Sequence, residues 1–201
     1  MIVNKIGIEK ELWLLDERGN LVEPRTFYLP FDEFGFLVEL RTEPHRSLQD
    51  LEIDYNIRLN RLREQIPKSY SLSNIPRMCL SRGDINQYAL CYHWERLKDT
   101  TANIYAGTMR SHATGIDGNY GTAGLHIHFS RYAYDNIRIQ LPIVDIVKKM
   151  DEKFYKYIHD ANRILGEFEI KPYGFEYRSL PTNAPIDEVV GYAYFVLNEV
   201  E

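Results

Sequence analysis

The chain has 201 residues, of which 24 are basic and 29 acidic, so its formal net charge is −5; hydrophobic residues make up 44%. This composition is ordinary for a globular protein and supplies enough chain for a sizeable core, so we expect a single domain over residues 1–201. The acidic balance and the lack of a basic run argue against nucleic acid and anionic membranes as partners.

The termini, apolar runs and cysteines predict a cytoplasmic protein. Apolar runs stay far below the ~20 residues of a membrane span, and acidic side chains follow the first residues too soon for a signal peptide. Cys79 and Cys91 are too few for a disulfide framework and lack metal-binding spacing. We expect both to be reduced core residues.

The first predicted element is a strand over residues 2–15, in which apolar and polar residues alternate. Glu9 and Glu11 are two residues apart and therefore share one face of that strand. Their carboxylates repel each other unless water solvates them or a cation bridges them, and the sequence leaves both possibilities open. A turn by composition over residues 16–20 precedes an expected return strand at Leu21 and Val22.

A second strong strand is predicted over residues 36–44. Glu39 has apolar neighbours on both sides, where an unpaired charge is costly. Glu39, Arg41 and Glu43 fall on one face of this strand. Either a salt bridge between strands or a metal ligand is consistent with that pattern.

Three helices are predicted. Apolar residues recur at three- and four-residue steps over residues 47–66, and Ser47 is suited to cap that helix. A second helix is expected to start near Asp135, to hold Pro142 in its early turns and to extend to residue 165. A third is expected over residues 186–199. The first two should cover one face of a sheet.

Residues 67–120 have the least regular pattern. A loop is expected over residues 81–88, followed by a strand or short helix over residues 89–97. Glycines punctuate the stretch that contains Arg110 and His112, which is typical of loops that hold substrates, although composition alone does not assign such a role.

Residues 121–130 alternate strictly, with Leu125 and its apolar partners on one face and His126 and His128 on the other. Imidazole is a common ligand of divalent metals and a donor to phosphate. The alternative is a half-exposed strand that carries two histidines by chance. A further strand is predicted over residues 171–181, with Glu176 and Arg178 on a common face.

Four segments stand in a recognisable order: Gly7-Ile-Glu9-Lys-Glu11, Phe36-Leu-Val-Glu39, Gly124-Leu-His126-Ile-His128 and Lys171-Pro-Tyr-Gly-Phe-Glu176-Tyr-Arg178. They resemble the G-x-E-x-E strand, the second metal-binding strand, the G-x-H-x-H strand and the K-P-Y-G-x-E-Y-R strand of the glutamine synthetase-like carboxylate–amine ligases. That superfamily includes glutamate–cysteine ligases and a compact phage-type amidoligase group. The resemblance spans residues 7–180, nearly the whole chain.

This resemblance implies an α+β fold with a curved, mostly antiparallel sheet, whose concave face carries metal and nucleotide and whose convex face carries helices. It implies a ligase that joins a small-molecule carboxylate, such as an amino acid or peptide, to an amine through an acyl phosphate, in the cytoplasm or in a phage host. ATP and Mg²⁺ or Mn²⁺ would be required, because carboxylate and triphosphate repel each other.

The resemblance also implies roles for individual residues. Glu9, His126 and Glu176 would hold the metal that bridges the phosphates. Glu11 and Glu39, with Glu43 or Asp32 as the third ligand, would hold a metal nearer the carboxylate substrate, where Glu39 would serve catalysis. His128 would donate to a phosphate, Arg178 would stabilise the transferring phosphoryl group, and Lys171 and Arg163 would contact other ATP phosphates. Glu169 departs from the family pattern, which tends to have Arg there, and this shifts one phosphate contact toward Arg163 or Lys171.

Two other functions are alternatives to this one. A metal-dependent hydrolase with the H-x-H segment at a barrel strand end fits less well, because a (β/α)₈ barrel generally needs ~250 residues in alternating units. A non-catalytic nucleotide- or metal-binding module on the same fold would keep buried carboxylates with no task, at a cost in stability. Nucleotide binding with ADP production would separate the ligase from both.

Overall fold

The computed structural model describes residues 2–31, 37–81, 101–105, 116–117, 120–133 and 137–200. Several predictions from the sequence fall outside these ranges. They concern Asp32, residues 82–97 with Cys91, Arg110, His112 and Asp135.

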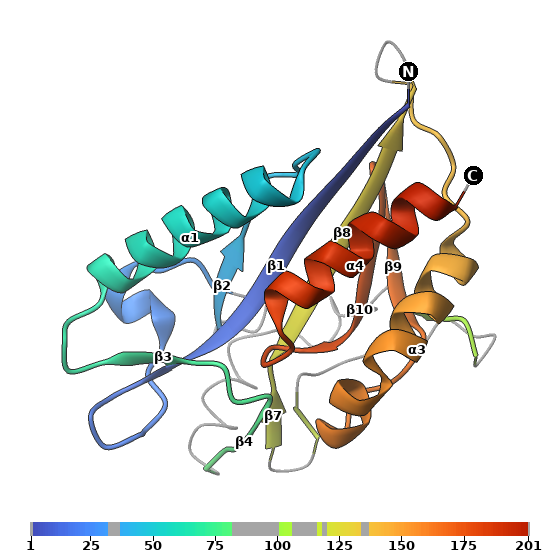
Figure 1. Cartoon of the computed structure of the whole chain (residues 1–201). Helices are drawn as coiled ribbons and strands as arrows, with labels where there is room; N and C mark the ends of the chain where they lie inside the picture. Colours follow the sequence, from blue (N-terminus) through green and yellow to red (C-terminus); the bar gives the residue numbers. More distant parts are fainter. Residues whose placement is uncertain are drawn as a thin grey trace.

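The described part of the chain is α+β and is built on an antiparallel sheet of seven strands (Figure 1). The strands follow the order β2-β1-β8-β10-β9-β5, and β3 pairs with β1 off this path. Their bounds are β1 (Val3–Leu15), β2 (Leu37–Arg41), β3 (Ser71–Ser73), β5 (Thr101–Asn103), β8 (Gly124–Tyr132), β9 (Glu167–Lys171) and β10 (Gly174–Pro181). A smaller antiparallel sheet joins β4 (Arg77–Cys79), β7 (Tyr120–Thr122) and β6 (Ile116–Asp117).

Three helices, α1 (Leu48–Gln65), α3 (Ile143–Asp160) and α4 (Ile186–Glu199), lie over the same face of the large sheet (Figure 1). Leu125, Ile127 and Phe129 point from β8 into the core beneath them, and all three are 0% exposed. The alternate residues of β8 therefore point to the opposite face. A short 3₁₀ helix, η1 (Pro24–Phe27), follows the first turn. None of the described helices combines the length and apolar character that crossing a bilayer requires.

The predicted first and last helices are confirmed. Helix α1 starts after Ser47, whose Oγ accepts a hydrogen bond from the Asp50 amide at 3.2 Å. The predicted start of the second helix is wrong, because α3 begins at Ile143 with Pro142 as its N-cap. A residue before proline is disfavoured in a helix, and Ile139 N donates instead to Arg131 O at 2.8 Å, at the end of β8.

Helix α3 also ends earlier than predicted, at Asp160. Asn162 has a φ of 55°, which lies in the left-handed region that stops a helix. The chain then enters β9, a strand that the sequence pattern did not predict.

Three strand predictions need correction. The predicted strand over residues 171–181 is a hairpin in which Lys171 of β9 pairs with Gly174 of β10. The predicted strand over residues 121–130 is divided between β7 and β8. Leu21 forms an isolated bridge with Leu15 rather than a return strand. Cys79, expected in the core, is exposed.

Gly174 fixes how closely β10 approaches β8. A Cβ at this position would lie 1.9 Å from the Phe129 carbonyl oxygen, well inside van der Waals contact. The glycine therefore allows β10 to start against β8 in the register that sets the site described below.

A buried hydrogen bond ties α3 to the underside of β10. Tyr177 Oη donates to Asp151 Oδ1 at 2.7 Å, and the two residues are 0% and 2% exposed. Burial raises the pKa of the Asp151 carboxyl, although the Tyr177 hydroxyl opposes that shift. This bond holds the strand that carries Glu176 and Arg178 on its other face.

We expect Tyr177→Phe to lower the free energy of unfolding by about 1–2 kcal/mol, because Asp151 loses a buried donor. Chemical denaturation measures this change. Tyr155→Phe is the matched control. Tyr155 is exposed on α3, the helix that carries Asp151, and should tolerate the substitution. Equal effects of the two substitutions would contradict a role for the buried bond.

Candidate functional site

Antiparallel pairing places polar residues from distant segments side by side on the face of the sheet opposite the helices. Glu9 on β1 pairs with Arg41 on β2 and with His126 on β8. Two residues further along β8, His128 pairs with Glu176 on β10. The register alone thus gathers polar groups from four sequence regions onto one surface.

Three of these residues form a candidate metal centre. One ligand atom from each of Glu9, His126 and Glu176 lies within 4.8 Å of the other two. His126 Nδ1 is 3.2 Å from Glu9 Oε1 and 3.0 Å from Glu176 Oε1. The residues are only 8%, 2% and 2% exposed, respectively. Carboxylate oxygens suit Mg²⁺ and Mn²⁺, and imidazole is a further ligand for divalent metals.

The buried oxygen Oε1 of Glu176 supports the fit of a cation. Among the described residues, none donates an aligned hydrogen bond to this atom, although His126 Nδ1 is close to it. A buried carboxylate oxygen without a donor carries a desolvation cost. A cation bound by Glu9, His126 and Glu176 would remove that cost.

The charges around the centre keep its carboxylates ionised. Burial would raise the pKa of Glu9, but His126, His128 and Arg41 hold it well below its usual range. Burial likewise opposes ionisation of Glu176, whose pKa is lowered by His126 and Arg178. His126 is itself shifted: burial lowers its pKa, but Glu11, Glu176 and Glu9 together raise it to about 9. The protein's own cations therefore balance the two carboxylates.

The structure brings together only some of the residues expected to hold a second metal. Glu11 and Glu39 are register partners on β1 and β2, and Glu11 Oε2 accepts from the Gly124 amide at 2.5 Å. Glu43 is not brought to them: its side chain is 73% exposed and lies 3.6 Å from Arg58. Strand β2 ends at Arg41, so the alternation that placed Glu43 on this face does not continue.

Gly124 is needed at the end of this row. A Cβ there would lie 2.7 Å from His126 Nε2 and 3.1 Å from both Glu11 Oε2 and Arg163 Nη2. The glycine thus makes room for an imidazole, a carboxylate and a guanidinium to converge, which accounts for its place in the G-x-H-x-H segment.

Two cations flank the centre on its other side. Lys171 Nζ lies 3.0 Å from Glu176 Oε2 and 2.7 Å from Glu169 Oε2. Arg178 Nη1 lies 2.9 Å from Glu169 Oε2 and 3.5 Å from Glu176 Oε1. Glu169 therefore lies between the two side chains expected to bind phosphate.

A β-bulge positions Arg178. The pairing of β10 with β8 shifts by one residue between Tyr177 and Leu180, and Arg178 and Ser179 form the irregular segment. Arg163 Nη2 donates to the Arg178 carbonyl at 2.6 Å, and Arg163 Nε donates to the Ser179 carbonyl at 3.2 Å. Arg163, expected at an ATP phosphate, is thus engaged with the backbone of the bulge.

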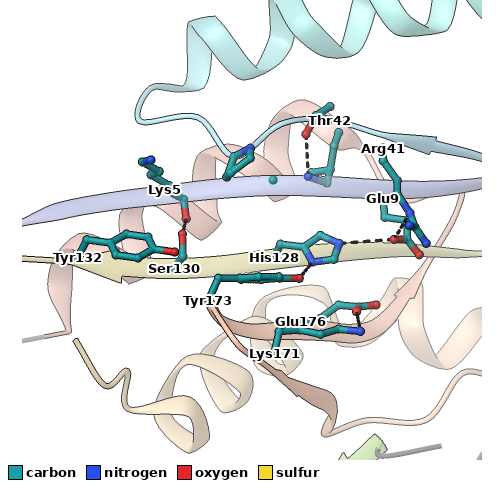
Figure 2. Close-up of a pocket in the computed structure, with 13 residues that line it drawn as sticks. Lys5, Glu9, Arg41, Thr42, His128, Ser130, Tyr132, Lys171, Tyr173 and Glu176 are labelled. Atoms are coloured by element: carbon teal, nitrogen blue, oxygen red, sulfur yellow. Dashed lines mark hydrogen bonds and ion pairs between the residues drawn. The ribbon is translucent and has the colours of Figure 1, made fainter. Parts of the chain in front are cut away.

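A cavity of about 420 Å³ opens beside the centre, with Glu9, Glu176 and His128 in its lining. Figure 2 shows His128 between Glu9 and Tyr173, with Lys171 next to Glu176. Tyr173 Oη lies 2.5 Å from His128 Nδ1. Tyr173 lies in the loop of the β9–β10 hairpin. It was not among the residues predicted for the site, although it belongs to the K-P-Y-G run that the sequence analysis singled out.

No protein-family model matches the chain, and no curated protein matches it in sequence. Among solved structures, a bifunctional glutathione synthetase from Pasteurella multocida matches with a TM-score of 0.42 and 17% sequence identity. The match covers 78% of this chain and 22% of that chain. A likeness at this level supports neither a fold family nor an activity for the chain.

If Glu9, His126 and Glu176 hold a cation, Glu176→Gln should weaken Mn²⁺ binding by about 10-fold or more, because it removes a charged ligand (about 1.4 kcal/mol per tenfold). Titration calorimetry with Mn²⁺ alone measures this. Glu43→Gln is the control and should bind as the wild type does, since Glu43 lies away from the centre. A loss in Glu43→Gln as large as that in Glu176→Gln would contradict the assignment.

Glu39 gives a pH-dependent expectation. Burial and the neighbouring Glu9 charge raise the pKa of Glu39 to about 8, despite Arg41. An unfolded Glu titrates near pH 4.3, so the stability from the bound proton is present below about pH 4 and lost as the pH rises through about 8. In the metal-free protein, Glu39→Gln should therefore show a smaller fall in melting temperature between about pH 6 and 8.5.

Thermal denaturation in the presence of a chelator makes this comparison. Glu43→Gln should follow the wild type across the same pH range. An identical fall in wild type and Glu39→Gln would indicate that the Arg41 salt bridge keeps Glu39 ionised.

Proposed function

We propose that the chain is an ATP-dependent carboxylate–amine ligase with a curved, glutamine synthetase-like sheet, and that it forms an amide bond through an acyl phosphate. The observation that carries the proposal is the convergence of Glu9, His126 and Glu176 beside Lys171 and Arg178, at the edge of a cavity. Buried acidic ligands next to paired cations are what a site for a metal-bound triphosphate requires.

The reaction has two steps. A carboxylate oxygen of the first substrate attacks the γ-phosphorus of ATP, the bond to the bridging oxygen breaks, and ADP leaves. The neutral amine then attacks the acyl carbon, the carbon–oxygen bond to phosphate breaks, and the amine proton is carried off on the phosphate. We propose an amino acid or small peptide as the carboxylate substrate.

Glu9, His126 and Glu176 would hold Mg²⁺ or Mn²⁺, with a second cation at Glu11 and Glu39. When bound, such a cation screens the charge on the phosphate oxygens and orients them for in-line transfer. The fit rests on the donor set and on the buried Oε1 of Glu176.

Arg178 and Lys171 would act on the phosphates from the opposite side. Both side chains form an ion pair with Glu169, and these contacts keep their charges at the centre. A guanidinium can contact two oxygens at once, so Arg178 is suited to the phosphoryl group whose charge is redistributed during transfer. Lys171 offers a point charge to a neighbouring phosphate.

His128 would donate a hydrogen bond to a phosphate. Burial and the Glu176 charge raise the pKa of Tyr173 to about 12, so its phenol stays protonated. A phenol that donates to His128 Nδ1 leaves Nε2 as the N–H donor. Nε2 lies 3.7 Å from Glu9 Oε2, at the edge of the cavity.

The two alternatives to a ligase are a metal-dependent hydrolase and a non-catalytic binding module. The hydrolase alternative required a barrel of parallel strands, whereas every strand pair in the described ranges is antiparallel. A non-catalytic binding module on the same fold would bind nucleotide without turning it over.

We further propose that the enzyme acts as one domain in the cytoplasm, or in the host cytoplasm if phage-encoded, without nucleic-acid or membrane partners.

Metal-dependent nucleotide binding is the first test. A non-hydrolysable ATP analogue should bind in the presence of Mg²⁺ or Mn²⁺ and much more weakly after chelation, as calorimetry can measure. Incubation with ATP and a panel of carboxylates should then release ADP, and hydroxylamine should trap the activated carboxylate as a hydroxamate. Binding without ADP release would favour the non-catalytic module, and equal affinity with and without metal would contradict the proposal.

Arg178→Lys tests the mechanism. It should lower the rate of ADP formation by ~10²-fold or more, because an ammonium cannot contact two phosphoryl oxygens as a guanidinium does. ATP affinity should change much less. Arg58→Lys on α1 is the matched control and should leave the rate unchanged. Equal losses in rate and ATP affinity for Arg178→Lys would show that Arg178 binds only the ground state.

A further inference from the structure

Arg41 joins two buried carboxylates on neighbouring strands. It is the last residue of β2, which lies at the edge of the large sheet. Arg41 Nε lies 2.8 Å from Glu9 Oε2 and also contacts Glu39 Oε1. No other basic side chain in the described ranges forms an ion pair with Glu39. Arg41 thus links the two side chains and serves as the counter-ion of Glu9.

Burial is strongly asymmetric across this contact. The Arg41 side chain is 63% exposed, whereas those of Glu9 and Glu39 are 11% and 6% exposed. The guanidinium reaches the carboxylates from solvent, and it can withdraw without disturbing the core. The two carboxylates are fixed by β1 and β2 and have no comparable way out.

Glu9 connects this contact to the candidate metal centre. Its Oε1 faces His126, whereas its Oε2 faces Arg41. Figure 2 shows Arg41 and Glu9 together at one end of the cavity, which both residues line. A divalent cation on Glu9 and the Arg41 guanidinium would be like charges at the same carboxylate, so each disfavours the other.

We propose that Arg41 is a displaceable counter-ion that sets the affinity of the centre for divalent cations. It neutralises Glu9 in the metal-free protein, contacts Glu39 beside it, and moves into solvent when a cation binds. The inference rests on the proposed metal centre but not on ATP or on a ligase reaction. It makes Arg41 a determinant of cation affinity rather than a ligand.

The test is calorimetric titration of Mn²⁺, without nucleotide, into wild type, Arg41→Gln, Arg41→Lys and Arg58→Gln. Arg41→Gln should bind Mn²⁺ at least about 5-fold more tightly, the lower end of typical coupling between sites. Arg41→Lys keeps the competing charge and should stay near wild type. Arg58→Gln controls for the loss of a basic side chain, because Arg58 pairs with Asp54 at 2.6 Å, away from the centre.

Thermal melting provides a second readout. Arg41→Gln leaves the buried Glu9 carboxylate without this counter-ion, so its melting temperature should fall in chelator and recover with Mn²⁺ more than that of wild type. If Arg41→Gln does not fold in chelator, the double variant Glu39→Gln/Arg41→Gln replaces it, with Glu39→Gln as reference. The double variant should still bind Mn²⁺ more tightly than its reference.

Unchanged or weaker Mn²⁺ binding on loss of Arg41 would overturn the inference and leave the metal centre standing. Absence of Mn²⁺ binding to every variant would overturn both. Mn²⁺ binding that follows the expected order, together with failure to bind ATP, would support Arg41 as counter-ion and contradict the ligase.

Discussion

The pairing of β8 between β1 and β10 is the constraint on which the site depends. Ile127 lies opposite Ile8 on one side and Tyr177 on the other, and all three are fully buried or nearly so beneath the helices. Because side chains alternate, a slip of one residue would expose this apolar row and bury the polar one. Burial of the core thus fixes the register, and the register carries Glu9, His126 and Glu176 to one point on the opposite face.

A carboxylate taken out of water is costly unless opposite charge and hydrogen bonds compensate it. Here the compensation comes from within the chain. Arg41 contacts Glu9 from the edge of the sheet, and Lys171 and Arg178 approach Glu176 from the hairpin. These cations let the acidic cluster form without a ligand.

The sequence predicted this face of the sheet well and its borders less well. Period-two alternation correctly assigned Glu9, His126 and Glu176 to one side, because alternation is the property that burial selects, but it failed for Glu43 beyond the end of β2. Lys171 and Glu176 are five residues apart and would face opposite sides of one straight strand. The two-residue loop of the hairpin reverses the chain and brings Lys171 to 3.0 Å from Glu176. Only the unpredicted strand β9 reveals this geometry.

Period-two alternation does not predict the bulge in β10. Strict alternation would turn Leu180 to the face that carries Arg178, yet Leu180 lies in the core at 0% exposure. The extra residue resolves that conflict, since it restores Leu180 to the apolar side after Arg178 has faced the cluster. The carbonyls freed from regular pairing then need donors, and the Arg163 guanidinium supplies them. An arginine that resembled a phosphate ligand in the sequence is thus engaged in holding the backbone that aims Arg178.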